Sequence, residues 1–225
     1  MEQSSVDSTL NIFDRFAEEG SARLISDLGN PLFMPPAILL GSCLLINISL
    51  LNSLLITGTA VIGFSLLPFL LTLYLFRKGY IHSLDLPIRK TRSVLYAFSI
   101  LSSIIAYLII WQLIQPNHNL IPAIILTLIA NLAIAFLLNL RWKVSVHSAS
   151  VAVAGTIYSL IYLWGMSSLP YVTLILSLLH LLLLLPVMMW ARYKLSVHSL
   201  TELFSGAIAG ILLTIIELII FTNLW

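Results

Sequence analysis

The sequence predicts an all-α protein: a polytopic bundle of about seven transmembrane helices, preceded by an amphipathic helix at the membrane surface. Of its 225 residues, 60% are hydrophobic and only 9% are charged, against about 25% charged in an ordinary globular domain. The apolar residues form blocks close to the roughly 20 residues that a helix needs to cross the hydrocarbon core. No linker-like stretch divides the blocks, so we expect one transmembrane domain at residues 31–225, after an N-terminal cytoplasmic or interfacial segment at residues 1–30.

The N-terminal segment does not have the pattern of a signal peptide. It carries acids and bases throughout and lacks an apolar core followed by a small-residue cleavage site. Apolar residues recur at roughly helical spacing with charged residues between them, although Gly20 could interrupt the helix: Leu10, Phe13, Ala17, Leu24 and Leu28. An amphipathic helix lying on the membrane is the simplest account, and a packing role is favoured over a regulatory one.

Polar residues between the apolar blocks place the spans. The expected ranges are 36–51, 55–76, 94–113, 121–140, 145–162, 171–190 and 203–224. The first span is short, and only a turn at Asn52 and Ser53 separates it from the second. The alternative for residues 32–76 is therefore one span plus a re-entrant segment. The single Cys43 lies in the first span, where we expect it to pack in the core or against lipid.

The basic residues indicate the orientation of the bundle. With seven spans, the N-terminus and the loops after spans two, four and six share one face. That face then holds all eleven Lys and Arg residues of the chain. The positive-inside rule makes it the cytoplasmic face, and we expect an integral protein of a bacterial inner membrane. No basic patch interleaved with aromatic residues points to a nucleic-acid partner.

The most informative polar segment is 191–202, between the sixth and seventh spans. His198 and Glu202 are four residues apart, so they lie on one face of a helix and can form a hydrogen bond. A carboxylate on one imidazole nitrogen fixes the tautomer and leaves the other nitrogen as a base or nucleophile. Arg192 can reach the same site as a bidentate phosphate ligand. The alternative is an interfacial His and Glu that only anchor a helix end.

A second polar segment, 141–147, offers similar chemistry at the start of the fifth span. Lys143, Ser145 and His147 supply a cation, a hydroxyl and an imidazole near a helix N-terminus, which favours an anion. Plain membrane anchoring by the cations would explain it as well. The string from Lys143 to Ser148 recurs almost unchanged from Lys194 to Ser199, and a similar local structural role explains this better than duplication.

A third cluster, Arg89, Lys90 and Arg92, precedes the third span. A role in setting the orientation of the protein in the membrane explains these cations about as well as phosphate binding does. Two spans separate this cluster from the segment at 141–147, and two more separate that segment from 191–202. An even number of crossings returns the chain to the same side, so all three can converge on one cytoplasmic pocket.

In this order, the three motifs resemble those of the type 2 phosphatidic acid phosphatase superfamily of membrane lipid phosphatases. That family carries a Lys/Arg-Pro motif, then Pro-Ser-Gly-His, then Ser-Arg-x5-His-x3-Asp. The resemblance covers residues 89–210, including the glycines Gly206 and Gly210. It implies a six-helix core of this phosphatase type, with one extra span in this chain.

The resemblance implies a role for each matching residue. His198 matches the nucleophile that forms a phosphohistidine, and Glu202 takes the place of the aspartate that orients it. His147 matches the histidine that protonates the leaving alkoxide. Arg192 and Ser145 match phosphate ligands, and Arg89 and Arg92 are candidates for the first motif. Lys143, the cation beside the second motif, is a further candidate phosphate ligand on the residue pattern alone. The implied catalysis uses no metal and no cofactor.

The motifs also depart from the family pattern. The first has Ser93 where proline is expected, and the second, at 144–147, lacks its proline and glycine. The third begins with Ala191, and its acid is Glu202 rather than Asp. Both imidazoles, an orienting acid and the key arginine are nevertheless present. On these residues we expect a lipid phosphatase acting on a prenyl phosphate or diphosphate or on a glycerolipid phosphate. The alternative is a catalytically inactive phosphatase-like subunit that binds an anionic lipid or a partner membrane protein.

Two further residues are polar within spans. For Glu217 we favour a protonated carboxyl that is hydrogen-bonded to a neighbouring span over a functional site, and for His180 a structural role. A transporter is disfavoured because no repeated pair of Gly- or Pro-broken helices marks a midplane site.

Overall fold

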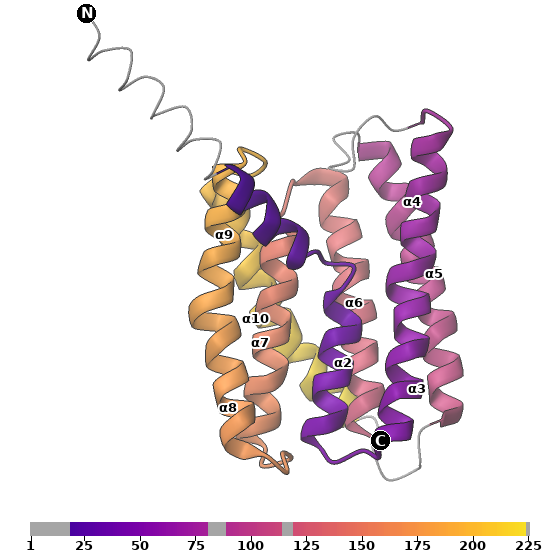
Figure 1. The fold of residues 1–225 in the computed structure, drawn as a ribbon, viewed down its shortest axis with the longest axis vertical. Helices are drawn as coiled ribbons and strands as arrows, with labels where there is room; N and C mark the ends of the chain where they lie inside the picture. Colours follow the sequence, from indigo (N-terminus) through magenta and orange to yellow (C-terminus); the bar gives the residue numbers. More distant parts are fainter. Residues whose placement is uncertain (1–18, 81–88, 114–118, 224–225) are drawn as a thin grey trace, which may run out of the picture.

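The computed structural model describes residues 19–80, 89–113 and 119–223, with the backbone alone at 89–92 and 113. All regular structure in these residues is helical, in an upright bundle (Figure 1). Residues 19–28 form a short helix. The later elements are α2 (Met34–Leu45), α3 (Leu50–Ala60), η1 (Val61–Leu66), α4 (Leu67–Arg77), α5 (Arg89–Leu113), α6 (Leu120–Arg141), α7 (Val146–Leu163), α8 (Pro170–Leu178), η2 (Leu179–Leu184), α9 (Leu185–Lys194) and α10 (Leu200–Thr222).

Six helices of the described chain are long and apolar enough to cross a membrane. Two of them are continuous through a π-helical segment, Leu50–Arg77 and Pro170–Lys194. The first expected span is instead the 12-residue helix α2, which is about 18 Å long and too short to cross the hydrocarbon core alone. The structure therefore supports a polytopic helical bundle with six candidate spans and one shorter apolar helix.

The turn after α2 lies earlier than the sequence analysis placed it. Asn52 and Ser53 are inside α3, and the turn comprises residues 46–49. Asn47 adopts a left-handed φ of 63°, a conformation that Asn tolerates better than most residues. Ser49 caps α3 by accepting a hydrogen bond from the backbone of Asn52. Asn52 was therefore misread as part of the turn that it follows.

Both π-helical segments lie just before a proline. Pro68 and Pro186 are the second residues of α4 and α9. Each lacks a backbone donor and would clash with the carbonyl four residues earlier, which in both cases lies inside the π segment. Both helices stay continuous through these segments. The two π segments do not face each other, because η1 packs on α2 and α5 whereas η2 packs on α7. The expectation that no repeated pair of Gly- or Pro-broken helices marks a midplane site stays a prediction.

Hydrogen bonds between distant segments define the two ends of the bundle. At one end, the backbone N–H of Ser168 donates to the carbonyl of Leu45 at 2.7 Å, which joins α2 to the α7–α8 loop. At the other end, Nζ of Lys143 donates to the carbonyl of Val197 at 2.6 Å. This second end, at the top of Figure 1, is called the basic end below. It holds every basic residue whose side chain the structure describes: Arg23, Arg77, Lys78, Arg141, Lys143, Arg192 and Lys194.

The helix at residues 19–28 also lies at the basic end, across the upper ends of α7 and α9 (Figure 1). Ala22 and Ser26 are buried against the bundle, while Leu24 and Leu28 are exposed. The expected packing role is consistent with these contacts, and within the described residues Gly20 is part of the helix at 19–28. The remainder of the expected amphipathic stripe lies outside the described residues.

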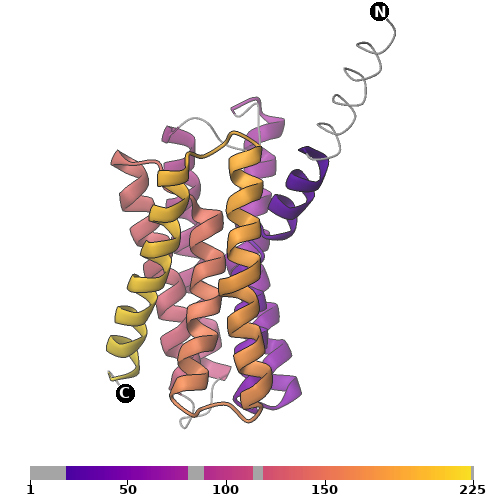
Figure 2. The ribbon, with the colours of Figure 1, turned by 90° about the vertical axis from the view of Figure 1, so that its left-hand side faces the viewer.

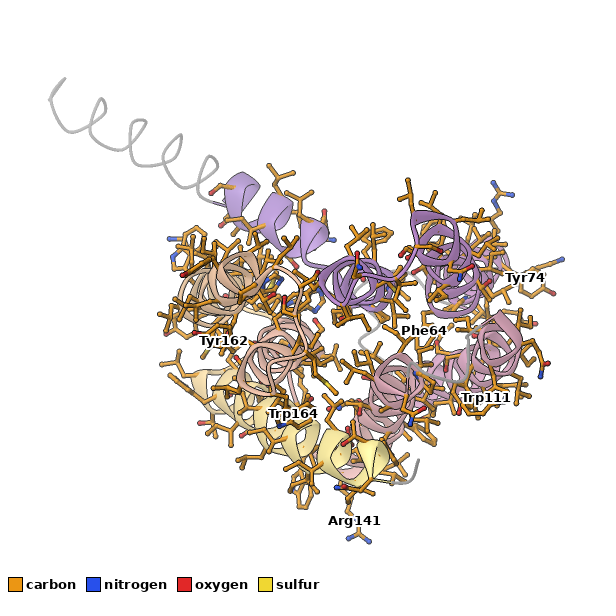
Figure 3. All side chains as sticks on the ribbon, turned by 90° about the horizontal axis from the view of Figure 1, so that it is seen from below. Phe64, Tyr74, Trp111, Arg141, Tyr162 and Trp164 are labelled. Atoms are coloured by element: carbon orange, nitrogen blue, oxygen red, sulfur yellow. The ribbon has the colours of Figure 1, made fainter. Side chains whose placement is uncertain are left out.

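Helix α7 packs most closely against α10, which runs at an incline to the upright α8–α9 (Figure 2). A Cβ added to Gly206 would lie 2.4 Å from the carbonyl oxygen of Ser145, and one added to Gly210 would lie 2.7 Å from that of Ala149. Small residues thus let the two backbones meet. Seen from below in Figure 3, side chains fill the space between the helices, and Arg141 extends outward from the rim.

Candidate functional site

The site forms where α7 and α10 begin. The backbone N–H of Ser145 donates to the carbonyl of Glu202 at 3.2 Å, which ties the start of one helix to the first turn of the other. Ser145 caps α7 and Ser199 caps α10. The repeated string is therefore used in two ways, since its third residue is the cap in the first copy and its sixth is the cap in the second. The expected similarity of structural role is wrong.

His198 and Glu202 form the predicted pair. Nδ1 of His198 lies 2.9 Å from Oε2 of Glu202. The same carboxylate oxygen accepts the backbone N–H of Ser199 at 3.2 Å, which completes a capping box. Glu202 is therefore held from two sides, and its hydrogen bond with Nδ1 leaves Nε2 as the ring nitrogen that this carboxylate does not occupy.

Burial sets the protonation state of His198. Its side chain is only 7% exposed, and burial lowers the pKa of His198 below the ordinary value of 6.5. The hydrogen bond from Glu202 opposes this shift, whereas the charges of Arg192 and Lys143 add to it. At neutral pH His198 is therefore a neutral imidazole, the form that can act as a nucleophile.

Lys143 brings a cation to this pair. Its Nζ lies 3.9 Å from Oε2 of Glu202 while it donates to the carbonyl of Val197. The side chain is 44% exposed, so the ion pair alone contributes little to stability. Its position at the rim suits contact with an anion that arrives from solvent.

His147 lies in the first turn of α7, near the other predicted residues. Arg192, His198 and Arg23 are the cationic or titratable groups that act on it electrostatically. Its Nδ1 is buried and has no hydrogen-bond partner among the described residues. The second and third sequence motifs are therefore brought together, with two imidazoles and one guanidinium at the junction of α7, α9 and α10.

Arg192 is buried in the last turn of α9, with 5% of its surface exposed. Its Nη1 donates to Oγ of Ser26, at 2.7 Å, in the N-terminal helix. Sequence reasoning did not identify Ser26 as part of the site. The sequence gives one indication of its place: Ser26 follows Ala22 by four residues, so a helix puts both on the same buried face.

The hydroxyl of Ser145 is fully buried. It accepts from the backbone N–H of Ser148 at 3.4 Å and from the hydroxyl of Ser148 at 3.1 Å. Its observed role is to cap α7, and a contact with phosphate stays a prediction.

The first motif does not join the other two through its helix. The backbone of Arg89 and Arg92 forms the start of α5, and α5 makes its main contacts with α3, η1, α4 and α6. The structure brings the second and third motifs together, and the convergence of the first motif with them stays a prediction. The side chains of Arg89 and Arg92 lie outside the described residues, so their phosphate contacts stay a prediction.

The two span residues singled out by the sequence, His180 and Glu217, each have a structural partner. Nδ1 of His180 lies 2.7 Å from the carbonyl of Leu176, and its ring meets Tyr158 edge-on. Oε2 of Glu217 accepts from Nδ2 of Asn131 at 2.5 Å. The expected bond between Glu217 and a neighbouring span is confirmed, as is the packing role of Cys43, which is fully buried in the core.

Comparisons with protein-family models, with curated proteins and with solved structures return no match to this chain.

Proposed function

We propose that the protein is an integral membrane lipid phosphatase that works through a phosphohistidine on His198. The observation that carries this proposal is the bond between Nδ1 of His198 and the carboxylate of Glu202. The carboxylate of Glu202 lies beside Lys143, and the charge of Arg192 acts on His198. A neutral, oriented imidazole among fixed cations is the arrangement that phosphoryl transfer to nitrogen requires.

In the first step, Nε2 of His198 attacks the phosphorus and the bond to the lipid oxygen breaks. His147 must carry a proton when the substrate is bound, a form that the negative charge of the phosphate favours, and it gives this proton to the leaving oxygen. The lipid departs as an alcohol from a monophosphate, or as the monophosphate from a diphosphate. The imidazole gains positive charge as the phosphorus–nitrogen bond forms. Glu202 stabilises that charge through the hydrogen bond it already makes to Nδ1.

In the second step, His147 accepts a proton from water as the water oxygen attacks the phosphorus. The phosphorus–nitrogen bond breaks, inorganic phosphate leaves, and His198 returns to its neutral form. Lys143 and Arg192 are the cations that balance the charge of the transferring group in both steps.

The position of the site suits a substrate whose tail stays in the bilayer. The site lies at one end of the bundle, and exposed aromatic side chains flank it in sequence: Trp142, Trp190 and Tyr193. Such residues are enriched at the membrane–water interface. The substrate class is therefore a prenyl phosphate or diphosphate or a glycerolipid phosphate.

We place the basic end in the cytoplasm, with the protein in a bacterial inner membrane. The support is the positive-inside rule applied to the eleven Lys and Arg residues.

A second function is favoured by two contacts that occupy predicted phosphate ligands. Arg192 donates to Ser26, and the hydroxyl of Ser145 serves as a helix cap. With these groups engaged, the protein would be an inactive phosphatase-like subunit that uses its remaining cations to hold an anionic lipid or a partner membrane protein.

Phosphate release separates the two functions. Purified wild type is compared with His198→Ala on a panel of prenyl and glycerolipid phosphates, with His180→Gln as a histidine replacement outside the site. The phosphatase proposal predicts release by wild type and the control but not by His198→Ala. A folded wild type that releases nothing from any lipid supports the inactive subunit instead.

A further inference from the structure

Glu217 is a carboxyl held inside the bundle, away from the proposed phosphatase site. It is 7% exposed and lies on the last part of α10, where Nδ2 of Asn131 on α6 donates to its Oε2 at 2.5 Å. The same Nδ2 lies 3.3 Å from the hydroxyl of Thr214, one turn earlier on α10. A single neutral donor, the amide of Asn131, thus reaches the carboxyl of Glu217, and it reaches Oε2 only.

The second oxygen, Oε1, is buried and has no hydrogen-bond partner among the described residues. No cationic or titratable side chain in the described part of the chain acts on the carboxyl from α6, α7 or α10. A bare carboxylate at membrane depth is costly and is uncommon without a partner. Uptake of one proton on Oε1 removes the charge and leaves the bond from Asn131 to Oε2 intact.

A small cavity lies between this region and the basic end. Most of its lining is apolar, and Asn131, the partner of Glu217, is the residue that links it to the carboxyl. Its volume is about 30 Å³, and it lies between α6, α7 and α10 with Asn131 and Asn139 in its lining. Asn139 is 6% exposed, and its Nδ2 has no partner among the described residues. A cavity of this size holds one or two water molecules, and the amide of Asn139 supplies a donor that water can satisfy.

The cavity lies on the side of Asn131 that faces the basic end. Asn139 lies two residues before Arg141 at the basic end, and Asn131 lies two helical turns deeper on α6. Beyond Asn131, the buried residues of α6 on the way to its other end are almost all apolar: Leu120, Ile121, Ala123, Ile124, Ile125 and Leu128. Water in the cavity can therefore approach Asn131, the partner of Glu217, from the side of the basic end.

We infer that Glu217 is an intramembrane proton-binding site that exchanges its proton with the basic end through the hydrated cavity between α6, α7 and α10. The ligand is a proton taken from water, which converts the carboxylate to the neutral acid. This site is separate from the phosphatase chemistry, because Glu217 does not contact His198, His147 or Arg192.

Infrared spectroscopy tests this assignment without any lipid substrate. Wild type and Glu217→Gln are reconstituted in phosphatidylcholine vesicles at neutral pH. The expected result is a carboxylic-acid C=O band that is present in wild type and absent from Glu217→Gln. A wild type without this band carries an ionised carboxylate and overturns the inference.

The rate at which the band shifts in D2O tests the route. Asn139→Leu removes the amide from the cavity and should slow the shift about tenfold or more, the factor given by about 1.4 kcal/mol. Asn223→Leu is the matched control, since Asn223 is exposed at the far end of α10, and it should exchange like wild type.

If Asn139→Leu folds and exchanges at the wild-type rate, the cavity is not the route. If Asn139→Leu fails to fold, Ala209→Val, which narrows the same cavity, replaces it and is judged in the same way.

Discussion

At the scale of single residues, the site depends on how His198 is held and charged. Glu202 fixes Nδ1 at 2.9 Å, and burial disfavours the imidazolium. Because the folded pKa lies below 6.5, the unfolded chain binds more protons than the folded protein just below that pH. His198 therefore gives its full contribution to stability above about pH 6.5 and loses it as the pH falls through the folded pKa.

Two substitutions should shift the pKa of His198 in opposite directions. Glu202→Gln removes the hydrogen-bonded negative charge and lowers the pKa further, while Lys143→Gln removes a nearby positive charge and raises it. The shift is measured by pH titration of the His198 ring resonances by NMR in detergent. Shifts of the same sign in both variants would show that these two residues do not set the charge of His198.

Replacement of Glu217 should leave phosphate release near the wild-type rate, because the carboxyl lies on the α6–α10 seam and not beside His198. Glu217→Gln keeps the shape and can still accept from Asn131. Turnover is measured with the preferred lipid of wild type. A loss above about tenfold, or 1.4 kcal/mol in activation free energy, would place Glu217 in the phosphatase mechanism.

At the scale of helices, close approach of α7 and α10 sets the geometry of the site. Gly206 faces the carbonyl of Ser145, the residue whose backbone N–H binds Glu202. The sequence marks the two helix starts, since Ser145 and Ser199 are strong N-cap residues and Glu202 completes a capping box. The contact of Arg192 with Ser26 was not predictable, because it joins residues 166 positions apart through the docking of a separate helix.

Gly206→Ala tests this packing. A Cβ at 2.4 Å from a backbone oxygen forces the helices apart, and overpacking of this kind destabilises by roughly 1–3 kcal/mol. Gly58→Ala is the matched control, since nothing lies within 4 Å of its added Cβ, and it should gain up to about 1 kcal/mol of helix propensity. Thermal unfolding in detergent measures both. Equal stability of the two variants would contradict the close approach.

At the scale of the whole molecule, hydropathy predicted the bundle and the end at which the basic residues gather. It predicted a short first span but placed its end at residue 51 rather than at Leu45, because the apolar block around residues 32–76 continues through the turn at residues 46–49. The turn depends on the φ of Asn47 and the cap at Ser49, which are local signals inside an apolar run. Hydropathy also gave no indication that residues 89–92 start a helix that packs away from α9.

Cysteine labelling tests the orientation. In a Cys43→Ser background, Tyr80→Cys places a thiol at the basic end, and Met166→Cys places one in the loop at the other end. With the basic end in the cytoplasm, a membrane-impermeant maleimide should label Met166→Cys in spheroplasts and Tyr80→Cys only after lysis. The reverse pattern would invert the proposed topology.

The most direct test of the central claim is to trap the phosphoenzyme. Wild type, His198→Ala and His180→Gln are incubated briefly with a lipid that carries radiolabelled phosphate, and the reaction is stopped in alkali, in which phosphohistidine is stable. The account predicts protein-bound label in wild type and His180→Gln that is lost in acid, and none in His198→Ala. Label that persists in His198→Ala, or phosphate release by wild type with no trapped label, would contradict His198 as the nucleophile.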